Sequence, residues 1–181
     1  MTVTAAPART GVPTTSRGAA AVRTTSFPTL ADGDPAGRSP ADRAAANKAV
    51  AVRVHANAMP ACSEAVLRHL LAPGFRNHDV LPGCSGDRDA LAATMHWFDD
   101  AFSDQRVEVL HAVAEGDLVA LHVAFSARHT GFFRGLPPTR RRFTVREMHM
   151  VRLQDGLEAE HWVVRDEAWL ERELRSDGPR G

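Results

Sequence analysis

The hydrophobic pattern divides the chain into a helical part followed by a strand-rich part. Apolar side chains recur at helical spacing and predict helices over about residues 42–58, 63–71 and 88–102. A short extended piece is expected over 75–80. From residue 107 the apolar period changes to two, which predicts strands over 107–114, 118–129, 142–153 and 157–164 and then a short helix over 167–174. Helices followed by a strand meander indicate an α+β fold, in which helices cover one face of a curved antiparallel sheet.

The first 40 residues are expected to form a disordered tail. They are rich in Ala, Thr, Ser, Pro and Gly and lack apolar periodicity, so they cannot offset the entropy cost of ordering. Three arginines and no acid before Asp32 also resemble an organellar transit peptide. The remaining chain predicts one domain over 41–177 and a flexible C-terminus over 178–181. Because no secretory apolar core is visible, the predicted location is cytoplasmic.

Composition excludes several classes of function. The 22 basic residues balance the 22 acidic residues, which argues against a nucleic-acid or membrane-surface partner. No apolar run approaches the roughly 18 residues of a membrane helix. The two cysteines, Cys62 and Cys84, predict neither a disulfide framework nor a structural zinc site. With no tyrosine, one lysine and nine histidines in the chain, imidazoles and carboxylates are the expected proton-transfer groups.

The last predicted hairpin allows two registers. A two-residue turn at Asp155-Gly156 would place Leu157 opposite Gln154, whereas a three-residue loop over 154–156 would place Leu157 opposite Leu153. The second register pairs Arg152 with Glu158 and Met148 with Trp162. Such cross-strand pairs contribute about 0.2–1 kcal/mol each, so the three-residue loop is predicted.

That register predicts a polar inner face on the hairpin. His149 lies opposite His161, and Glu147 is their diagonal neighbour. A single buried histidine is commonly a satisfied core residue. Two histidines and a carboxylate on one face instead favour a functional cavity, because burying unpaired charge is costly. Two imidazoles and a carboxylate can also bind zinc or ferrous iron. No HxH, HxxxH or HExxH spacing supports a metal site, and none is predicted.

The opposite face of the hairpin carries Met148, Met150 and Trp162. A monomer rarely exposes such an apolar patch, so this face predicts a homodimer interface. Coverage by the N-terminal tail is the alternative.

Several short motifs, taken in order, resemble the SnoaL-like polyketide cyclases over about residues 43–175. The main one is the run HTGFFRGLPPT at 129–139. It is followed by RLQDG at 152–156, EHW at 160–162 and Asp166, and preceded by FRNH at 75–78, FSD at 102–104 and AEGD at 114–117.

The resemblance implies a cone-shaped barrel of the nuclear-transport-factor-2 type, with a deep cavity between helices and sheet and dimerisation through the outer sheet face. Its best-known members close a ring of an aromatic polyketide ester by cofactor-free intramolecular aldol condensation. Their acid/base pair comes from the last two strands, where this sequence has Glu147 and His161. The acid-first order also matches a branch associated with hydroxylation. Arg140 departs from the glycine that is frequent after Pro-Pro-Thr.

The expected substrate is therefore a hydrophobic, polyketide-like small molecule, with no cofactor. His161 is the expected base, and Glu147 either orients it or shuttles the proton itself. His149 and Asp166 complete the predicted catalytic set, although Asp166 could instead cap the last helix. The predicted substrate-binding residues are Asn77, His78, Trp97, Phe98, His129, Phe132 and Phe133, each with a structural role as its alternative. A related hydroxylase or isomerase and a non-catalytic binding protein remain open.

Overall fold

The computed structural model describes residues 37–80 and 84–176. The predicted tail lies outside the described residues except for 37–40, and the predicted C-terminal segment 178–181 lies wholly outside them. No helix among the described residues is long and apolar enough to span a membrane.

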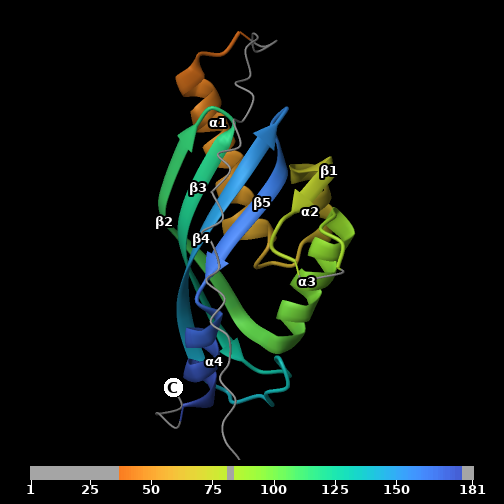
Figure 1. Ribbon diagram of the computed structural model, residues 1–181, viewed down its shortest axis with the longest axis vertical. Coiled ribbons are helices and arrows are strands. Elements are labelled where there is room, and N and C mark those ends of the chain that lie inside the picture. The colour runs from red at the N-terminus through yellow and green to blue at the C-terminus, as the bar shows by residue number, and fades with distance from the viewer. Residues whose placement is uncertain (1–36, 81–83, 177–181) are drawn as a thin grey trace, which may run out of the picture. The chain divides into compact units, whose positions relative to one another are not determined.

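The described chain forms helices packed on one five-stranded sheet (Figure 1). The elements are α1 (Pro40–Arg53), the π-helical turn η1 (Val54–Ala58), α2 (Glu64–Leu70), β1 (Leu71–Asn77), α3 (Arg88–Ala101), β2 (Phe102–Glu115), β3 (Leu118–His129), β4 (Arg142–Gln154), β5 (Leu157–Arg165) and α4 (Glu167–Arg175). The strand order is β1-β5-β4-β3-β2, so the sheet is open, with β1 and β2 at its edges. The predicted α+β class is confirmed.

The sheet is mixed, and this is where the expectation of a purely antiparallel sheet was wrong. Strand β1 runs parallel to β5, while the other neighbours are antiparallel. It begins at Leu71, four residues before the predicted extended piece. Its pairing is irregular between Leu71 and Arg76, where Pro73 has no N–H to donate. An edge strand tolerates such a proline.

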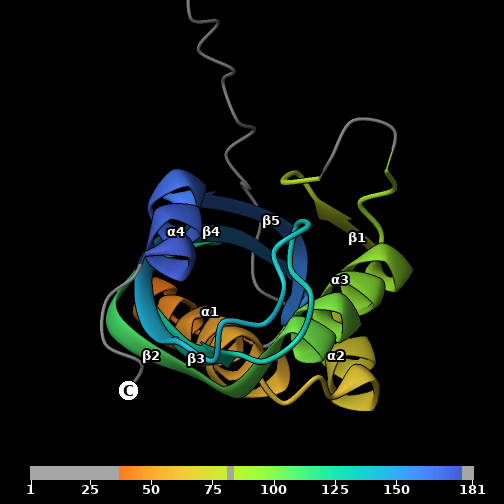
Figure 2. The ribbon, with the colours of Figure 1, turned by 90° about the horizontal axis from the view of Figure 1, so that it is seen from below.

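The N-terminal helix is capped and buried as its sequence predicts. Ser39 accepts the backbone N–H of Asp42 at 3.2 Å, and Pro40 occupies the first helical position. Ala51 is fully buried against the inner face of the sheet, and Val54, at the start of η1, is fully buried in a cluster with residues of α2 and β1. Figure 2 shows α1 on the concave side of strands β2 to β5, with α2 and α3 beside β1.

The register of the last hairpin differs from the prediction. Gln154 pairs with Leu157 and Leu153 with Glu158, so the turn has two residues rather than three. Asp155 and Gly156 both adopt positive φ, at 52° and 77°. This is the type I′ geometry that matches strand twist, and it outweighed the side-chain pairs that had favoured the longer loop.

A β-bulge then restores the predicted inner face. The pairing shifts between Leu153↔Glu158 and Arg152↔Glu160, which leaves Ala159 as an extra residue. Beyond the bulge, Val151 pairs with His161. The direct pairing of His149 with His161 was therefore wrong, and the two histidines are diagonal neighbours on the same face.

Candidate active site

A cavity of about 100 Å³ lies between the helices and the inner face of β4 and β5. Its polar lining consists of His55, Asn77, Asp79, Thr94, Gln105, Glu147, His149, His161 and Arg165. Its apolar lining consists of Met59, Pro60, Leu91, Met95, Phe98, Val107 and Phe125. The three residues of the predicted inner face, Glu147, His149 and His161, all line it.

Four of the polar side chains are positioned by the strands that carry them. Glu147 and His149 alternate along β4, and His161 enters from β5, so the three share a face. Asn77 ends β1 and is the register partner of His161 in the parallel pair. The backbone N–H of His78 donates to the carbonyl of His161 at 2.8 Å, which anchors this end of β1.

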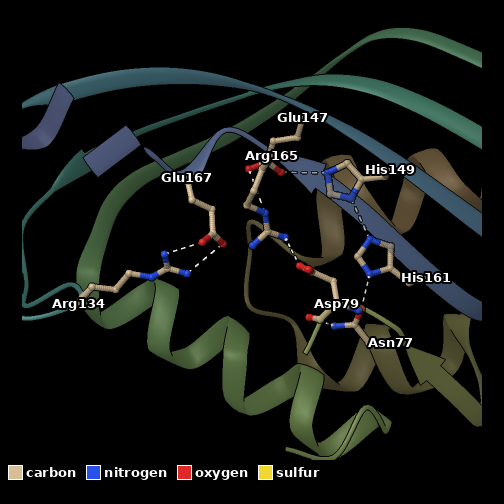
Figure 3. Close-up of polar contacts among 8 residues, drawn as sticks. All are labelled: Asn77, Asp79, Arg134, Glu147, His149, His161, Arg165 and Glu167. Carbon is tan, nitrogen blue, oxygen red and sulfur yellow. Dashed lines mark hydrogen bonds and ion pairs between the residues drawn. The ribbon is translucent and has the colours of Figure 1, made fainter. Parts of the chain in front are cut away.

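One continuous chain of hydrogen bonds joins Glu147, His149, His161 and Asn77 (Figure 3). Glu147 Oε2 lies 3.0 Å from His149 Nε2, and His149 Nδ1 lies 2.9 Å from His161 Nε2. His161 Nδ1 lies 3.0 Å from Asn77 Oδ1. The two imidazoles and Glu147 are thus linked by direct contacts, with the Asn77 amide oxygen at the end of the chain.

Asn77 sets the direction of the chain. Its Oδ1 accepts the backbone N–H of Asp79 at 3.1 Å, which identifies that atom as the oxygen. His161 Nδ1 must therefore carry a proton and donate it to Asn77. In a neutral ring His161 Nε2 is then an acceptor for His149 Nδ1–H. The remaining nitrogen, His149 Nε2, faces Glu147 as an acceptor, so one proton is shared between Glu147 and His149.

Burial favours the uncharged forms of all three titratable groups. It raises the pKa of the Glu147 carboxyl above its ordinary value, against the opposing effect of Arg165. Burial also holds the pKa of His149 and of His161 well below the usual range, and nearby His55 lowers both further. These shifts act in the same direction as the hydrogen bonds, towards a proton on Glu147 and neutral rings at His149 and His161.

Arg165 and Asp79 extend the polar wall beyond the predicted residues. Arg165 Nη2 lies 3.3 Å from Asp79 Oδ2, and its Nε lies 3.8 Å from Glu147 Oε1. Arg165 is the cross-strand partner of Glu147. The correct register would have placed it in the site, whereas the predicted register paired Glu147 with residue 163.

His55 is a third imidazole that the sequence reasoning missed. It is 2% exposed, and its ring centroid lies 4.7 Å from that of His149 and 5.1 Å from that of His161. The spacing of Ala51, Val54, His55 and Ala58 follows the i, i+3, i+4, i+7 helical stripe. The prediction followed only a spacing of four, which passes through Val54 and skips His55.

Glu158 was predicted to pair with Arg152 but is buried. The bulge turns Glu158 inward, where it is 0% exposed and its Oε2 lies 3.4 Å from His55 Nε2. Arg152 instead contacts Glu160 at 2.8 Å and Asp117 at 2.5 Å. A bulge adjacent to the turn carried no signal in the sequence.

Three predicted polar residues lie away from the cavity lining. Asp166 caps α4 by accepting the N–H of Trp169 at 2.8 Å. His78 contacts Glu160 at 2.7 Å and stacks on Trp162 with centroids 4.5 Å apart. His129 is fully buried beside Thr139 and Phe102. Their geometry corresponds to the structural alternatives for these positions.

The aromatic residues predicted to bind substrate also fall into two groups, those that line the cavity and those that do not. Phe98 lines the cavity and connects it to an aromatic cluster that contains Phe102, Phe125 and Phe133. Trp97 stacks on Phe133 at 5.0 Å but is 40% exposed outside. Phe132 is 69% exposed. Phe133, Phe132 and Trp97 are not among the lining residues.

The outer face of the same sheet is apolar and also carries a histidine pair. Met148, Met150 and Val164 are 48%, 40% and 74% exposed. His111 and His122 are register partners on β2 and β3, with Nδ1 atoms 3.1 Å apart and stacked rings.

Comparison with known proteins identifies the family. The family model of the SnoaL-like polyketide cyclase matches residues 47–174, so the chain belongs to the SnoaL-like polyketide cyclase family. Over 100 residues it is 33% identical to the aklanonic acid methyl ester cyclase DauD of Streptomyces sp. (strain C5), a match that covers 55% of this chain and 60% of the relative. The chain thus spans about three fifths of the length of that curated relative.

Solved structures support the same fold. TsrD from Streptomyces laurentii is 26% identical with a TM-score of 0.66, over 72% of this chain and 96% of that protein. AclR from Streptomyces galilaeus, described as a putative hydroxylase, is 27% identical with a TM-score of 0.60, over 75% and 97%. The predicted family and its nuclear-transport-factor-2-like architecture are confirmed.

Proposed function

We propose that this protein is a polyketide ester cyclase that closes a ring by intramolecular aldol condensation without a cofactor. The hydrogen-bonded chain from Glu147 to Asn77 carries the proposal, because it places a base and an acid in one cavity. Family membership and similarity to a methyl ester cyclase support the reaction class.

His161 is the proposed base. A C–H bond flanked by a ketone and an ester is acidic enough for an imidazole to remove its proton. Asn77 holds the proton of His161 on Nδ1, so the lone pair lies on Nε2. His149 N–H occupies that lone pair, and bound substrate must displace this contact before the substrate proton can transfer to Nε2.

Glu147 is the proposed acid. The carbanion attacks the carbon of a second, more distant ketone of the same substrate, a C–C bond forms as the C=O π bond breaks, and the oxygen of that second ketone becomes an alkoxide. Burial raises the pKa of Glu147, which favours the protonated carboxyl that can donate its proton to the alkoxide. His161 has then gained one proton and Glu147 has lost one, and the starting state returns when the added proton leaves His161 and Glu147 takes one up. His149 can carry that proton only after its own proton has moved from Nδ1 to Nε2.

The cavity supports an aromatic substrate whose reacting end enters it. Its volume of about 100 Å³ is smaller than the roughly 300–1,000 Å³ of sites that enclose a whole drug-sized ligand. Apolar contacts from Met95, Phe98 and Phe125 suit a flat ring system, and Glu147, His149 and His161 supply polar groups in the same lining.

A related hydroxylation is the second candidate, supported by the similarity to AclR. Hydroxylation consumes an oxidant, whereas aldol closure does not. Oxygen dependence of product formation therefore separates the two reactions.

We also propose that the protein is a cytoplasmic homodimer that pairs through the outer sheet face. Exposed Met148, Met150 and Val164 form a continuous apolar patch with Trp162. The free cysteines Cys62 and Cys84 fit a reducing compartment.

The test is incubation with an uncyclised aromatic polyketide methyl ester in anaerobic, cofactor-free buffer, with ring closure followed by chromatography. The proposal expects a cyclised product of unchanged mass, formed faster than in buffer alone. A product heavier by one oxygen atom that forms only in air would establish the hydroxylase instead. Substrate binding without conversion under either condition would indicate a non-catalytic binding protein.

A further inference from the structure

Three buried imidazoles converge on one point of the cavity. His55, His149 and His161 come from η1, β4 and β5 and are 2%, 8% and 3% exposed. One nitrogen of each ring lies within 4.8 Å of the nitrogens that the other two offer. Among the described residues, this is the only group of three or more His, Cys, Asp or Glu side chains with such spacing.

Each ring also has a carboxylate or amide oxygen beside one of its nitrogens. Glu147 Oε2 lies 3.0 Å from His149 Nε2, and Asn77 Oδ1 lies 3.0 Å from His161 Nδ1 (Figure 3). Glu158 Oε2 lies 3.4 Å from His55 Nε2. In proteins that bind metals through histidine, a carboxylate or amide oxygen in this position orients the ring and directs its second nitrogen to the ion.

Glu158 places a buried carboxyl group beside the cluster. Its side chain is 0% exposed, and neither carboxylate oxygen accepts a hydrogen bond. His55 Nε2 likewise makes no hydrogen bond, since its approach to Glu158 is too poorly aligned. A buried carboxylate without hydrogen bonds is costly, and a cation bound beside it would reduce that cost.

We propose that His55, His149 and His161 bind one divalent first-row transition metal ion, with Glu158 supplying the charge that stabilises it. Imidazole nitrogen is a preferred ligand of zinc and ferrous iron. Two nitrogens that each lie ~2.0–2.1 Å from a tetrahedral zinc ion are roughly 3.3 Å apart. His149 Nδ1 and His161 Nε2 lie 2.9 Å apart, so a small separation of the two rings admits the ion.

The ion takes the place of the proton between His149 and His161. With zinc bound, His149 donates from Nε2 to Glu147 and His161 donates from Nδ1 to Asn77, while both inner nitrogens become ligands. The ion would occupy His161 Nε2, which is the proposed base, so bound metal would inhibit ring closure. The inference therefore concerns binding to the free protein and does not depend on the proposed cyclase reaction.

The test is calorimetric titration of the metal-free full chain with Zn²⁺, repeated with Co²⁺ while visible absorption is recorded. We expect one zinc ion per chain with a dissociation constant below about 1 µM, and Co²⁺ bands of a low-coordinate site. His55→Gln should weaken binding at least ~100-fold, and Glu158→Gln about 10- to 100-fold. Both replacements are close in volume to the original side chains, and circular dichroism melting checks that each variant folds.

The matched control is the double variant His111→Ala/His122→Ala, which removes the exposed histidine pair and should leave zinc affinity unchanged. Absence of one-to-one zinc binding by the wild-type chain would overturn the proposal. Retention of wild-type affinity in folded His55→Gln, or its loss in the control, would also overturn it. If His55 and Glu158 form only a structural ion pair, their variants lower the melting temperature and the wild-type chain binds no zinc.

Discussion

Two histidine pairs lie on opposite faces of the same sheet. The inner pair joins His149 Nδ1 to His161 Nε2 at 2.9 Å, and the outer pair brings the Nδ1 atoms of His111 and His122 to 3.1 Å. The rings of both pairs are nearly parallel, with interplanar angles of 19° and 8°.

The surroundings separate the two pairs. The inner pair is buried between Glu147 and Asn77, which define where its protons lie, and burial lowers the pKa of both rings. The outer pair lies on the exposed outer face of the sheet, away from the cavity. Both faces therefore bring two imidazoles close together. Only the inner face also orients the rings through hydrogen bonds and excludes water from them.

The strongest test of this contrast is removal of the groups that transfer protons on the inner face. His161→Ala and Glu147→Gln should each lower turnover at least ~100-fold with the fold preserved, because each removes an acid–base group. The readout is the rate of ring closure beside a circular dichroism spectrum. His111→Ala is the matched outer-face control and should change the rate by less than about twofold. Full activity in both inner variants would exclude this site.

The outer face is expected to matter for association rather than chemistry. Met150→Arg places a charge in the proposed dimer interface and should raise the dimer dissociation constant at least ~30-fold, since desolvating an unpaired charge costs several kcal/mol. Sedimentation velocity measures the change. Phe132→Arg is the control, because Phe132 is exposed in the segment between β3 and β4 and lies outside the sheet. A wild-type chain that sediments as a monomer would contradict the dimer.

Substitution of Asn77 tests how much the orientation of the His161 ring contributes to turnover at the inner histidine pair. Asn77→Leu removes the acceptor that holds the His161 proton on Nδ1, and should lower kcat roughly tenfold with a smaller effect on KM. Asn77→Asp keeps an acceptor oxygen at the same position and should recover most of the rate. Equal losses in the two variants would indicate that Asn77 acts only through packing.

His129 supplies the smallest expected effect, on stability. It is buried but lies outside the cavity, and burial lowers its pKa below the ordinary value. The unfolded chain therefore takes up a proton first as the pH falls below about 6.5, so stability should decrease from that pH downward through the lower folded-state pKa.

The control for this effect is a variant without the imidazole. His129→Leu should cost about 1–3 kcal/mol at pH 7, because the hydrogen bonds from the hydroxyl and the N–H of Thr139 are lost. The variant should also lose the His129 share of the pH dependence. Urea unfolding at pH 5 and pH 7 measures both, and an unchanged pH dependence would contradict the assignment.

Patterning predicted most of the elements to within a few residues and placed Glu147, His149 and His161 on one face. The face assignment survived an incorrect register because the two-residue turn and the bulge together shift the pairing by two residues, which preserves side-chain alternation. His55 could have been predicted from the i, i+3, i+4, i+7 stripe of the first helix but was missed. The burial of Glu158 could not be predicted, because it results from a bulge, and a bulge depends on how the finished sheet twists.

The sequence by itself determined the family, the α+β class and which strand positions alternate inward, because these depend on local periodicity and ordered motifs. Only the tertiary structure brought His55 to the two strand histidines and set Asn77 beside His161 through the parallel pairing of β1. Only it distinguished the inner histidine pair from the outer one. The physical reason is that burial and hydrogen-bond partners are properties of contacts between distant segments, and those contacts decide where a proton can lie.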